Sequence, residues 1–213
     1  MRILKGSKIS IINKNEFLEI IEKFGHVIID LGTGDGRFIY QNALDNPSNF
    51  YIGIDPAASQ MEEYSKKSLK KKLKNLLYVV VSIEHLDTDL NWLADELYIN
   101  LPWGSLLSLL MSGDDTAYAR ISGLIKKGST LNIMLGYSKE SEPGETQRLG
   151  LEEINEQVIR DKIISGFEKA GLKNTKLKLL ETANLKEFKT SWAKKLAFGR
   201  PRPLYLLSFQ ILR

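Results

Sequence analysis

A glycine-rich turn between an apolar segment and a helical segment constrains the fold of this chain more than any other feature. Residues 26–30 read HVIID, an apolar run typical of a buried parallel strand. Residues 30–37 continue as DLGTGDGR. Gly32, Gly34 and Gly36 allow this turn to be tight and its backbone to approach a ligand closely. Because a strand, a glycine-rich turn and a helix open a βαβ unit, the sequence predicts an α/β fold.

Strand and helix signals alternate along the rest of the chain. The expected strands cover residues 26–30, 50–55, 77–82, 96–101, 131–137, 176–180 and 204–212, and the expected helices cover residues 14–24, 37–45, 59–74, 151–170 and about 188–198. Residues 138–150, rich in Glu, Ser, Pro and Gly, predict a long loop. We expect one domain over residues 1–213, with a Rossmann-like, seven-stranded, mostly parallel sheet and helices on both faces. A short β-hairpin at about residues 1–12 precedes this sheet.

Composition narrows the kinds of site and the location. The chain has 213 residues with no Cys and two His, which excludes disulfides and thiolate metal sites and argues against a histidine metal site. We therefore expect no metal. The N-terminal segment lacks a long apolar core, and no apolar run is long enough to span a bilayer, so we expect a cytoplasmic protein without membrane contact. The formal net charge of +4 is modest, but the lysines and arginines are clustered.

Acids at the ends of two expected strands favour one type of ligand. Asp30 stands where a dinucleotide-binding turn would hold a pyrophosphate, and a carboxylate would repel that group. It can instead accept a hydrogen bond from the ammonium of S-adenosylmethionine, which carries no phosphate. Asp55, followed by Pro56, stands at a spacing along the chain that is typical of a carboxylate gripping both ribose hydroxyls. The sequence therefore predicts an S-adenosylmethionine site, with a plain α/β turn as the alternative.

The strand over residues 77–82 ends beside the expected adenine ring. Ile83 can pack on the ring and Glu84 can lie near its amino group, or Glu84 can be a solvated acid on a loop. His85 is either a catalytic base or an ordinary loop histidine.

The next strand end carries residues 100–104, which read NLPWG. Because ligands bind beyond the carboxyl ends of strands in open α/β sheets, Pro102 and Trp103 are expected to border the transferable methyl group. The segment is similar to the N-P-P-Y loop of methyltransferases that act on amino groups of bases, and it departs from that loop at Leu101 and Trp103. A tryptophan packed under a loop is the alternative role for Trp103.

Basic residues gather in two places. Residues 186–202 interleave Trp192 with lysines and arginines, a pattern typical of nucleic-acid binding because rings stack on bases and cations meet phosphates. The same segment can form an amphipathic helix with Trp192 in the core, and both roles stay open. The second place is one helical face without an acidic partner in its lysine-rich run, formed by Lys66, Lys67, Lys70, Lys71 and Lys74. That face either follows phosphates or is simply solvated.

Taken together, these motifs resemble the aminoglycoside-resistance methyltransferases that modify N1 of adenine-1408 in 16S ribosomal RNA, the NpmA/KamB type. The resemblance runs from end to end and includes residues 4–6, 30–37, 51–56, 102–104, 192–194 and 196–200. It implies a class I S-adenosylmethionine-dependent methyltransferase that acts on 16S rRNA in the 30S subunit and confers aminoglycoside resistance. We expect it to act as a monomer.

The resemblance also implies roles for individual residues. The cosubstrate would contact Asp30, Gly32, Thr33, Gly34, Asp35, Asp55, Pro56, Ile83, Glu84 and Ser105. Trp103 and Trp192 would hold a flipped adenine between their rings, with Pro102 and Thr190 beside it. The ribosomal RNA would contact Lys66, Lys67, Lys70, Lys71, Arg148, Lys195, Arg200 and Arg202. Where this chain has Thr190, the family commonly has Ser, and both side chains carry a hydroxyl. Where this chain has Lys195, the family commonly has Arg, and a lysine lacks the guanidinium group that makes bidentate contacts.

No convincing general base stands beside Trp103, and the implied reaction needs none. Adenine N1 carries a lone pair at neutral pH and can attack a sulfonium methyl directly, so that positioning supplies the catalysis. The motifs leave two other functions open. One is methylation of another rRNA or tRNA position, such as guanine N7. The other is RNA binding without catalysis by a protein that keeps the cofactor fold.

Overall fold

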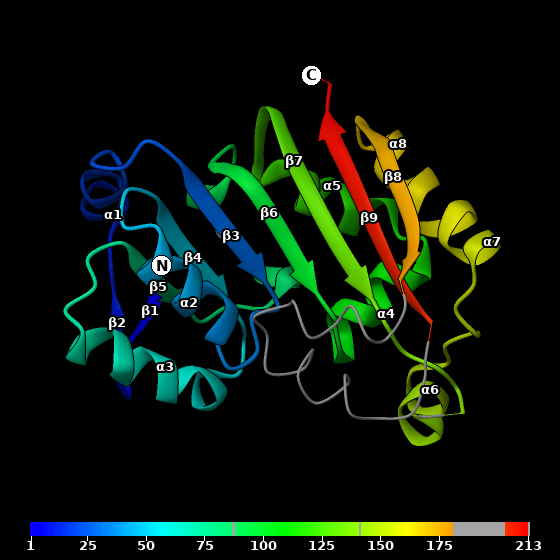
Figure 1. Ribbon diagram of the computed structural model, residues 1–213, viewed down its shortest axis with the longest axis horizontal. Helices are drawn as coiled ribbons and strands as arrows, with labels where there is room; N and C mark the ends of the chain where they lie inside the picture. The colour runs from blue at the N-terminus through cyan, green and yellow to red at the C-terminus, as the bar shows by residue number, and fades with distance from the viewer. Residues whose placement is uncertain (87, 141, 181–202, 213) are drawn as a thin grey trace.

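The computed structural model describes residues 1–86, 88–140, 142–180 and 203–212. Its strands are β1 (Arg2–Lys5), β2 (Lys8–Ile11), β3 (Val27–Leu31), β4 (Phe50–Ile54), β5 (Leu76–Val79), β6 (Ala94–Asn100), β7 (Ile125–Leu135), β8 (Leu172–Leu180) and β9 (Leu204–Ile211). They form one sheet in the order β2-β1-β5-β4-β3-β6-β7-β9-β8 (Figure 1). The five central strands from β5 to β7 are parallel, and β9 and the N-terminal hairpin join antiparallel. The expected mostly parallel α/β sheet is confirmed.

The N-terminal hairpin lengthens the sheet instead of standing apart from it. The described residues therefore form nine strands in one sheet, where we expected seven preceded by a hairpin. Ile3 of β1 pairs with Val79 of β5, and Leu4 pairs with Tyr78. Ile3 and Leu4 are buried. The pairing thus hides two apolar side chains and covers backbone groups that β5 would otherwise present at an open edge.

Helices occupy the connections between the strands. They are α1 (Lys14–Ile21), α2 (Arg37–Asp45), α3 (Ala58–Lys70), α4 (Gly104–Ser112), α5 (Asp115–Gly123), α6 (Pro143–Leu149), α7 (Glu156–Val158) and α8 (Ser165–Lys169), with short 3₁₀ turns η1 (Ile83–His85) and η2 (Thr88–Leu90) and a π-helical turn η3 (Ile159–Ile164). A capping box starts α1, since Asn13 Oδ1 accepts from the Glu16 N–H and Glu16 Oε2 accepts from the Asn13 N–H, both at 3.0 Å. The bounds of α2 are those expected.

Three expectations about local structure are wrong. The long loop expected over residues 138–150 contains α6, which Pro143 starts because its fixed φ suits a first helical position. The helix expected over residues 151–170 starts at Glu156, because the Asn155 side chain accepts from the Val158 N–H at 2.9 Å and caps it there. The helix expected over residues 59–74 ends at Lys70.

Helices cover both faces of the sheet. On one face α2 and α3 pack through Ile39, Tyr40 and Met61, which belong to one buried apolar cluster. On the other face α4, α5 and α8 contribute to a larger buried cluster. Figure 1 shows α2 and α3 in front of the sheet and α5 and α8 behind it. The two layers fix the carboxyl ends of β3, β4 and β6 next to one another.

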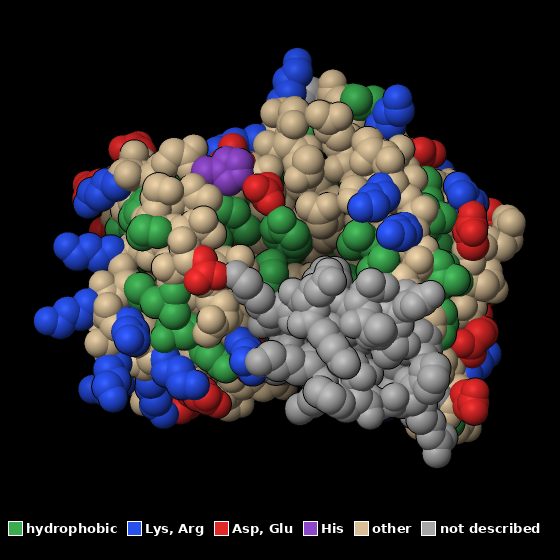
Figure 2. All heavy atoms as spheres, in the orientation of Figure 1, with side chains coloured by type: hydrophobic (Ala, Val, Ile, Leu, Met, Phe, Trp, Pro, Cys, Tyr) green, Lys and Arg blue, Asp and Glu red, His purple; other side chains and the backbone are tan. Residues whose placement is uncertain are grey.

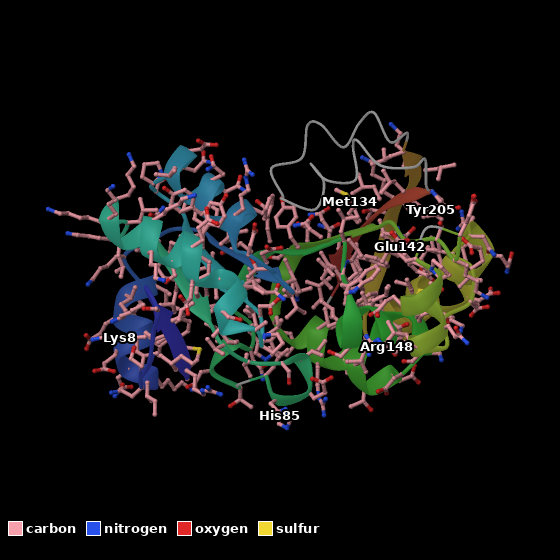
Figure 3. All side chains as sticks on the ribbon, turned by 90° about the horizontal axis from the view of Figure 1, so that it is seen from below. Lys8, His85, Met134, Glu142, Arg148 and Tyr205 are labelled. Carbon is pink, nitrogen blue, oxygen red and sulfur yellow. The ribbon has the colours of Figure 1, made fainter. Side chains whose placement is uncertain are left out.

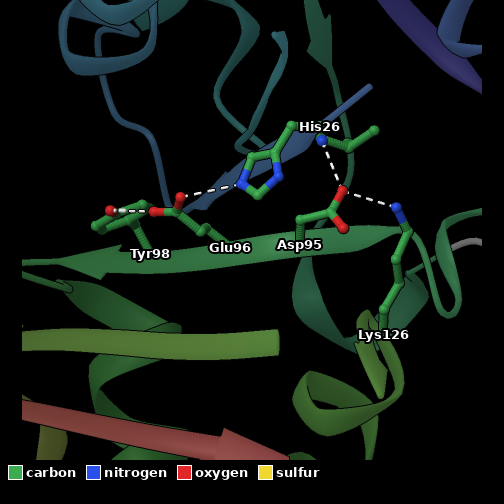
Figure 4. Close-up of polar contacts among 6 residues, drawn as sticks. His26, Asp95, Glu96, Tyr98 and Lys126 are labelled. Atoms are coloured by element: carbon green, nitrogen blue, oxygen red, sulfur yellow. Dashed lines mark hydrogen bonds and ion pairs between the residues drawn. The ribbon is translucent and has the colours of Figure 1, made fainter. Parts of the chain in front are cut away.

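Polar pairs join the opposite, amino ends of β3, β6 and β7 (Figure 4). His26 Nε2 lies 3.0 Å from Glu96 Oε1. Asp95 accepts from the Val27 N–H at 2.8 Å and from Lys126 Nζ at 2.7 Å. These contacts hold the register of three neighbouring strands at the end remote from the glycine-rich turn.

Candidate active site

The glycine-rich turn binds the end of β3 to the end of β4. The N–H groups of Gly32 and Thr33 both donate to the Ile54 carbonyl, at 2.8 and 3.0 Å. Gly32 has φ +75°, and a Cβ on it would lie 2.6 Å from Leu106 Cδ2 of α4. Only glycine combines this left-handed backbone with so close an approach of α4.

Asp30 is a buried carboxylate whose partners are neutral. Its side chain is 2% exposed. Oδ2 accepts from the Thr33 hydroxyl at 2.6 Å, and Oδ1 accepts from the Asn100 amide at 3.0 Å. Burial raises the pKa of Asp30 to about 6, against the opposing effect of the two hydrogen bonds. No Lys, Arg or His of the described ranges forms an ion pair with it, so the site lacks a cation that a ligand could supply.

Asp55 follows β4 at the same edge of the sheet. Its carboxylate accepts from the Gly34 N–H at 3.0 Å and from the Ala57 N–H at 2.8 Å. Burial raises the pKa of Asp55 above its ordinary value, and the two backbone hydrogen bonds oppose that rise. The carboxylate is thereby held in one orientation at the rim of the turn.

These residues surround a cavity of about 340 Å³ at the carboxyl ends of β3, β4 and β6. Its lining contains nine residues expected at the site, namely Asp30, Gly32, Thr33, Gly34, Asp35, Asp55, Pro56, Trp103 and Ser105. A smaller cavity of about 30 Å³ adjoins it, and Gly32, Pro56 and Ser105 line both. Ile83, 4% exposed, lines the smaller one. The structure thus brings the three strand ends expected to bind one ligand into contact with one space.

Glu84 and His85, which follow β5 in the turn η1, lie apart from the cavity. Glu84 is exposed and lines neither cavity, and a hydrogen bond with Ser82 lowers the pKa of its carboxyl. His85 Nδ1 lies 3.1 Å from Ser82 Oγ. His85 lines another hollow, beside the hairpin, which shares Pro56 with the cavity, and Figure 3 shows His85 on the opposite side of the molecule from Met134 and Tyr205. Of the two roles left open for His85, its position favours the ordinary loop histidine.

The segment after β6 turns sharply into α4. Leu101 has φ +51°, a left-handed conformation that costs an L residue about 1–2 kcal/mol. Its N–H donates to the Met134 carbonyl at 2.8 Å, which holds the turn against β7. Pro102 is buried, whereas Trp103 is 39% exposed and lines the cavity. This position favours contact of Trp103 with a ligand over packing under a loop.

Part of the cavity wall was not predicted from the sequence. Phe38, Ala57, Gln60 and Asn100 also line it. Phe38 comes from the first turn of α2 and packs on Tyr98 with tilted rings whose centroids lie 5.3 Å apart. The signal was available for Asn100, which ends a predicted strand, but the sequence does not show that its amide faces Asp30.

The lysine face on α3 has acidic partners in the part of the helix that precedes the lysine-rich run. Lys66 Nζ lies 2.7 Å from Glu62 Oε2, and Lys67 Nζ lies 2.5 Å from Glu63 Oε1. The face therefore has acidic partners one turn earlier in the helix, outside the lysine-rich run, because residues four apart are neighbours. Lys71 lies at the C-cap, beyond the last residue of α3. Figure 2 shows Lys and Arg side chains gathered over α3.

Arg148 of α6 is exposed and forms two hydrogen bonds with Glu145, from Nε at 2.8 Å and from Nη2 at 2.5 Å. Figures 1 and 3 place α6 at the opposite end of the molecule from α3. The remaining expected residues, Thr190, Trp192, Lys195, Arg200 and Arg202, belong to the basic aromatic segment 186–202 and lie outside the described residues.

Among the residues that the structure describes, no helix has the length and apolar character needed to cross a membrane. No group of three or more His, Asp or Glu side chains in the same ranges could hold a metal ion.

Comparison with known proteins gives matches along the whole chain. The family model NpmA, described as 16S rRNA (adenine(1408)-N(1))-methyltransferase, matches residues 2–211. The 16S rRNA (adenine(1408)-N(1))-methyltransferase of Escherichia coli is 35% identical over 213 residues, which cover 98% of this chain and 97% of that protein. The crystal structure of the aminoglycoside resistance methyltransferase NpmB1 is 31% identical with a TM-score of 0.81, covering 99% of this chain and 98% of that one. The 16S rRNA methyltransferase KamB is 26% identical with a TM-score of 0.87, covering 99% of each chain.

Proposed function

The chain belongs to the NpmA family of 16S rRNA (adenine(1408)-N(1))-methyltransferases, and we propose that it methylates N1 of adenine-1408 within the 30S subunit. The methyl donor is S-adenosylmethionine, and the modification confers aminoglycoside resistance. One observation carries the proposal: Asp30, Asp55 and Trp103, from three neighbouring strand ends, line one cavity. The full-length match favours this function over methylation of another base and over RNA binding without catalysis.

The donor set of the cavity fits S-adenosylmethionine. Asp30 offers a buried carboxylate that no cation of the described residues pairs with, which suits the amino-acid ammonium. Asp55 offers carboxylate lone pairs at the rim, which suit the two ribose hydroxyls. Gly32 leaves room for close approach, and Ile83 gives an apolar wall for adenine. When bound, the cosubstrate supplies an electrophilic methyl group on a sulfonium.

The protein has to hold the target base in line with that methyl group. N1 lies on the Watson–Crick edge, so the base must leave its stack at a cost of a few kcal/mol. Trp103 borders the cavity and can return about 1–3 kcal/mol by stacking on one face of the base. We assign the other face to Trp192, with Pro102 and Thr190 beside the base. Stacking also suits the positive charge of the N1-methyl product through cation–π attraction.

Docking on the 30S subunit is assigned to basic side chains on both sides of the cavity. Lys66, Lys67, Lys70 and Lys71 lie at the α3 end, and Arg148 lies on α6. Lys195, Arg200 and Arg202 complete this proposed phosphate-binding surface. We propose that the protein acts as a monomer in the cytoplasm, where the ribosomal subunits are. Exposed cations of this kind give affinity that falls with salt.

Methylation of purified 30S subunits by Trp103 variants tests the proposed function. Trp103→Ala should lose most of the activity, whereas Trp103→Phe should keep part of it, because a smaller ring still stacks. Trp92→Ala is the matched control, because Trp92 is also exposed, at 60%, but precedes β6 at the opposite end of that strand. Full activity in a folded Trp103→Ala protein would remove the base-stacking role.

A further inference from the structure

Asn100 connects the carboxylate of the glycine-rich turn with the segment that carries Trp103. It is the last residue of β6, it is partly buried, and it lines the same cavity as Trp103. Its Nδ2 donates to Asp30 Oδ1 at 3.0 Å. This hydrogen bond crosses from β6 to β3. The two strands pair in parallel, and Asp30 lies opposite Tyr98, two residues before Asn100.

The surroundings of Asp30 make that bond electrostatically important. Burial disfavours its ionised form, and so do the nearby carboxylates of Asp55 and Asp35. The Tyr98 phenol on β6 donates to Glu96 Oε2 at 2.6 Å, and burial raises its pKa, so it stays neutral. The α4 helix, which closes the other side, contains no titratable side chain. In the described ranges, the groups that favour the charge on Asp30 are the hydroxyl of Thr33 and the amide of Asn100.

We propose that Asn100 is a positioning residue for cosubstrate binding, which fixes Asp30 as an oriented, ionised acceptor for the ammonium group of S-adenosylmethionine. The inference rests on the proposed function, because it takes the ligand class from it. This role also gives a function to the asparagine at the end of β6. Adenine N1 has no proton to lose, so the site needs no acceptor for the base here, and the amide serves the cosubstrate instead.

Two substitutions at this position separate the role from simple packing. Asn100→Ala removes one donor to a charged acceptor, which should weaken S-adenosylmethionine binding about tenfold at pH 7.5. Asn100→Asp replaces the donor with a second carboxylate beside Asp30, and such a pair shares one proton. Both variants should therefore need a higher pH than the wild type to reach half of their full affinity. The shift should be larger for Asn100→Asp than for Asn100→Ala.

A control substitution on β7 and a substitution of the other hydrogen-bond donor to Asp30 test whether the effect is specific to that carboxylate. Asn132→Ala makes the same change on the neighbouring strand β7, where Asn132 Oδ1 accepts from Ser208 Oγ at 2.8 Å. It should leave both the affinity and its pH dependence unchanged. Thr33→Val removes the other donor to Asp30 and should move the pH dependence in the same direction as Asn100→Ala.

The test is calorimetric titration of each full-length protein with S-adenosylmethionine between about pH 5 and 7.5, which stays below the pKa of about 7.7–8.0 of an α-amino group. Thermal melts in the same buffers identify variants that fail to fold. The inference is supported if the two Asn100 variants and Thr33→Val bind more weakly and shift their midpoints upward. It is overturned if their affinity falls by one constant factor at every pH, or if folded Thr33→Val keeps the wild-type midpoint when the Asn100 variants do not fold. A wild type that binds no S-adenosylmethionine at any pH would instead overturn the proposed function itself.

Discussion

Alanine at Gly36 should destabilise the protein far more than alanine at Gly34, although both glycines belong to one turn. Both have left-handed backbones, with φ +77° and +59°. A Cβ on Gly36 would lie 2.3 Å from Cε1 of Tyr78. Tyr78 is 1% exposed and donates its hydroxyl to the Gly36 carbonyl at 3.1 Å, so displacing the ring would break this hydrogen bond. A Cβ on Gly34 would meet nothing within 4 Å.

The structure sets the size of each effect. A left-handed alanine costs about 1–2 kcal/mol, and loss of freedom in the unfolded chain returns about 0.4–1 kcal/mol. At the midpoints of these ranges, Gly34→Ala should therefore cost about 0.8 kcal/mol. Gly36→Ala adds an overpacking cost of about 1–3 kcal/mol, which brings its total to about 2–4 kcal/mol.

Thermal melts of the ligand-free proteins measure this difference. At about 2–4 °C per kcal/mol for a chain of this size, Gly36→Ala should lower Tm by about 5–15 °C and Gly34→Ala by no more than about 4 °C. Equal Tm values for the two variants would refute the close packing of the turn on Tyr78. Such a result would also remove the reason given for the glycine at this position.

Two other predictions concern charged side chains. Because burial raises the pKa of Asp30 to about 6, its ionised form at pH 7 disfavours the folded ligand-free protein, and this cost disappears as the pH falls through 6 toward the unfolded value of 3.8. Asp30→Asn should thus raise the ligand-free Tm at pH 7 and lose that advantage near pH 4, while calorimetry shows S-adenosylmethionine binding weakened more than tenfold. An unchanged affinity would contradict the ammonium contact. Lys71→Gln should lower the salt slope of 30S binding by about 0.9, whereas Lys67→Gln should lower it less, because Glu63 already neutralises the Lys67 ammonium. Equal slopes for the two variants and the wild type would return both lysines to a solvated face.

Local rules were sufficient for the elements that the chain specifies through neighbouring residues. The capping box of Asn13 and Glu16, the bounds of α2 and the strands around the glycine-rich turn follow from spacing and residue type. The helices α4 and α5 were not predicted, although Gly113 and Asp114 mark the end of one and the cap of the other. Residues 104–112 read GSLLSLLMS, so their polar positions are small serines without the charged side chains that usually mark the exposed face of a surface helix.

The candidate site was predictable at the ends of strands and less so between them. Asp30 and Asp55 were expected at one edge of the sheet because parallel strands place their carboxyl ends together. The contact of Asn100 with Asp30 depends on the pairing of β3 with β6, two strands separated by 70 positions in sequence, and no local pattern encodes it. The exposed position of Glu84 depends likewise on how η1 turns after β5.

Mapping of the methylated nucleotide in 30S subunits tests the central proposal most directly. Purified subunits would be incubated with the protein and S-adenosylmethionine, and their 16S rRNA would then be read by primer extension, which stops where a Watson–Crick edge is methylated. The proposed function predicts a new stop at adenine-1408, together with the mass of one added methyl group on that nucleotide. A methyl group on any other nucleotide, or none in the presence of protein that binds S-adenosylmethionine, would contradict it.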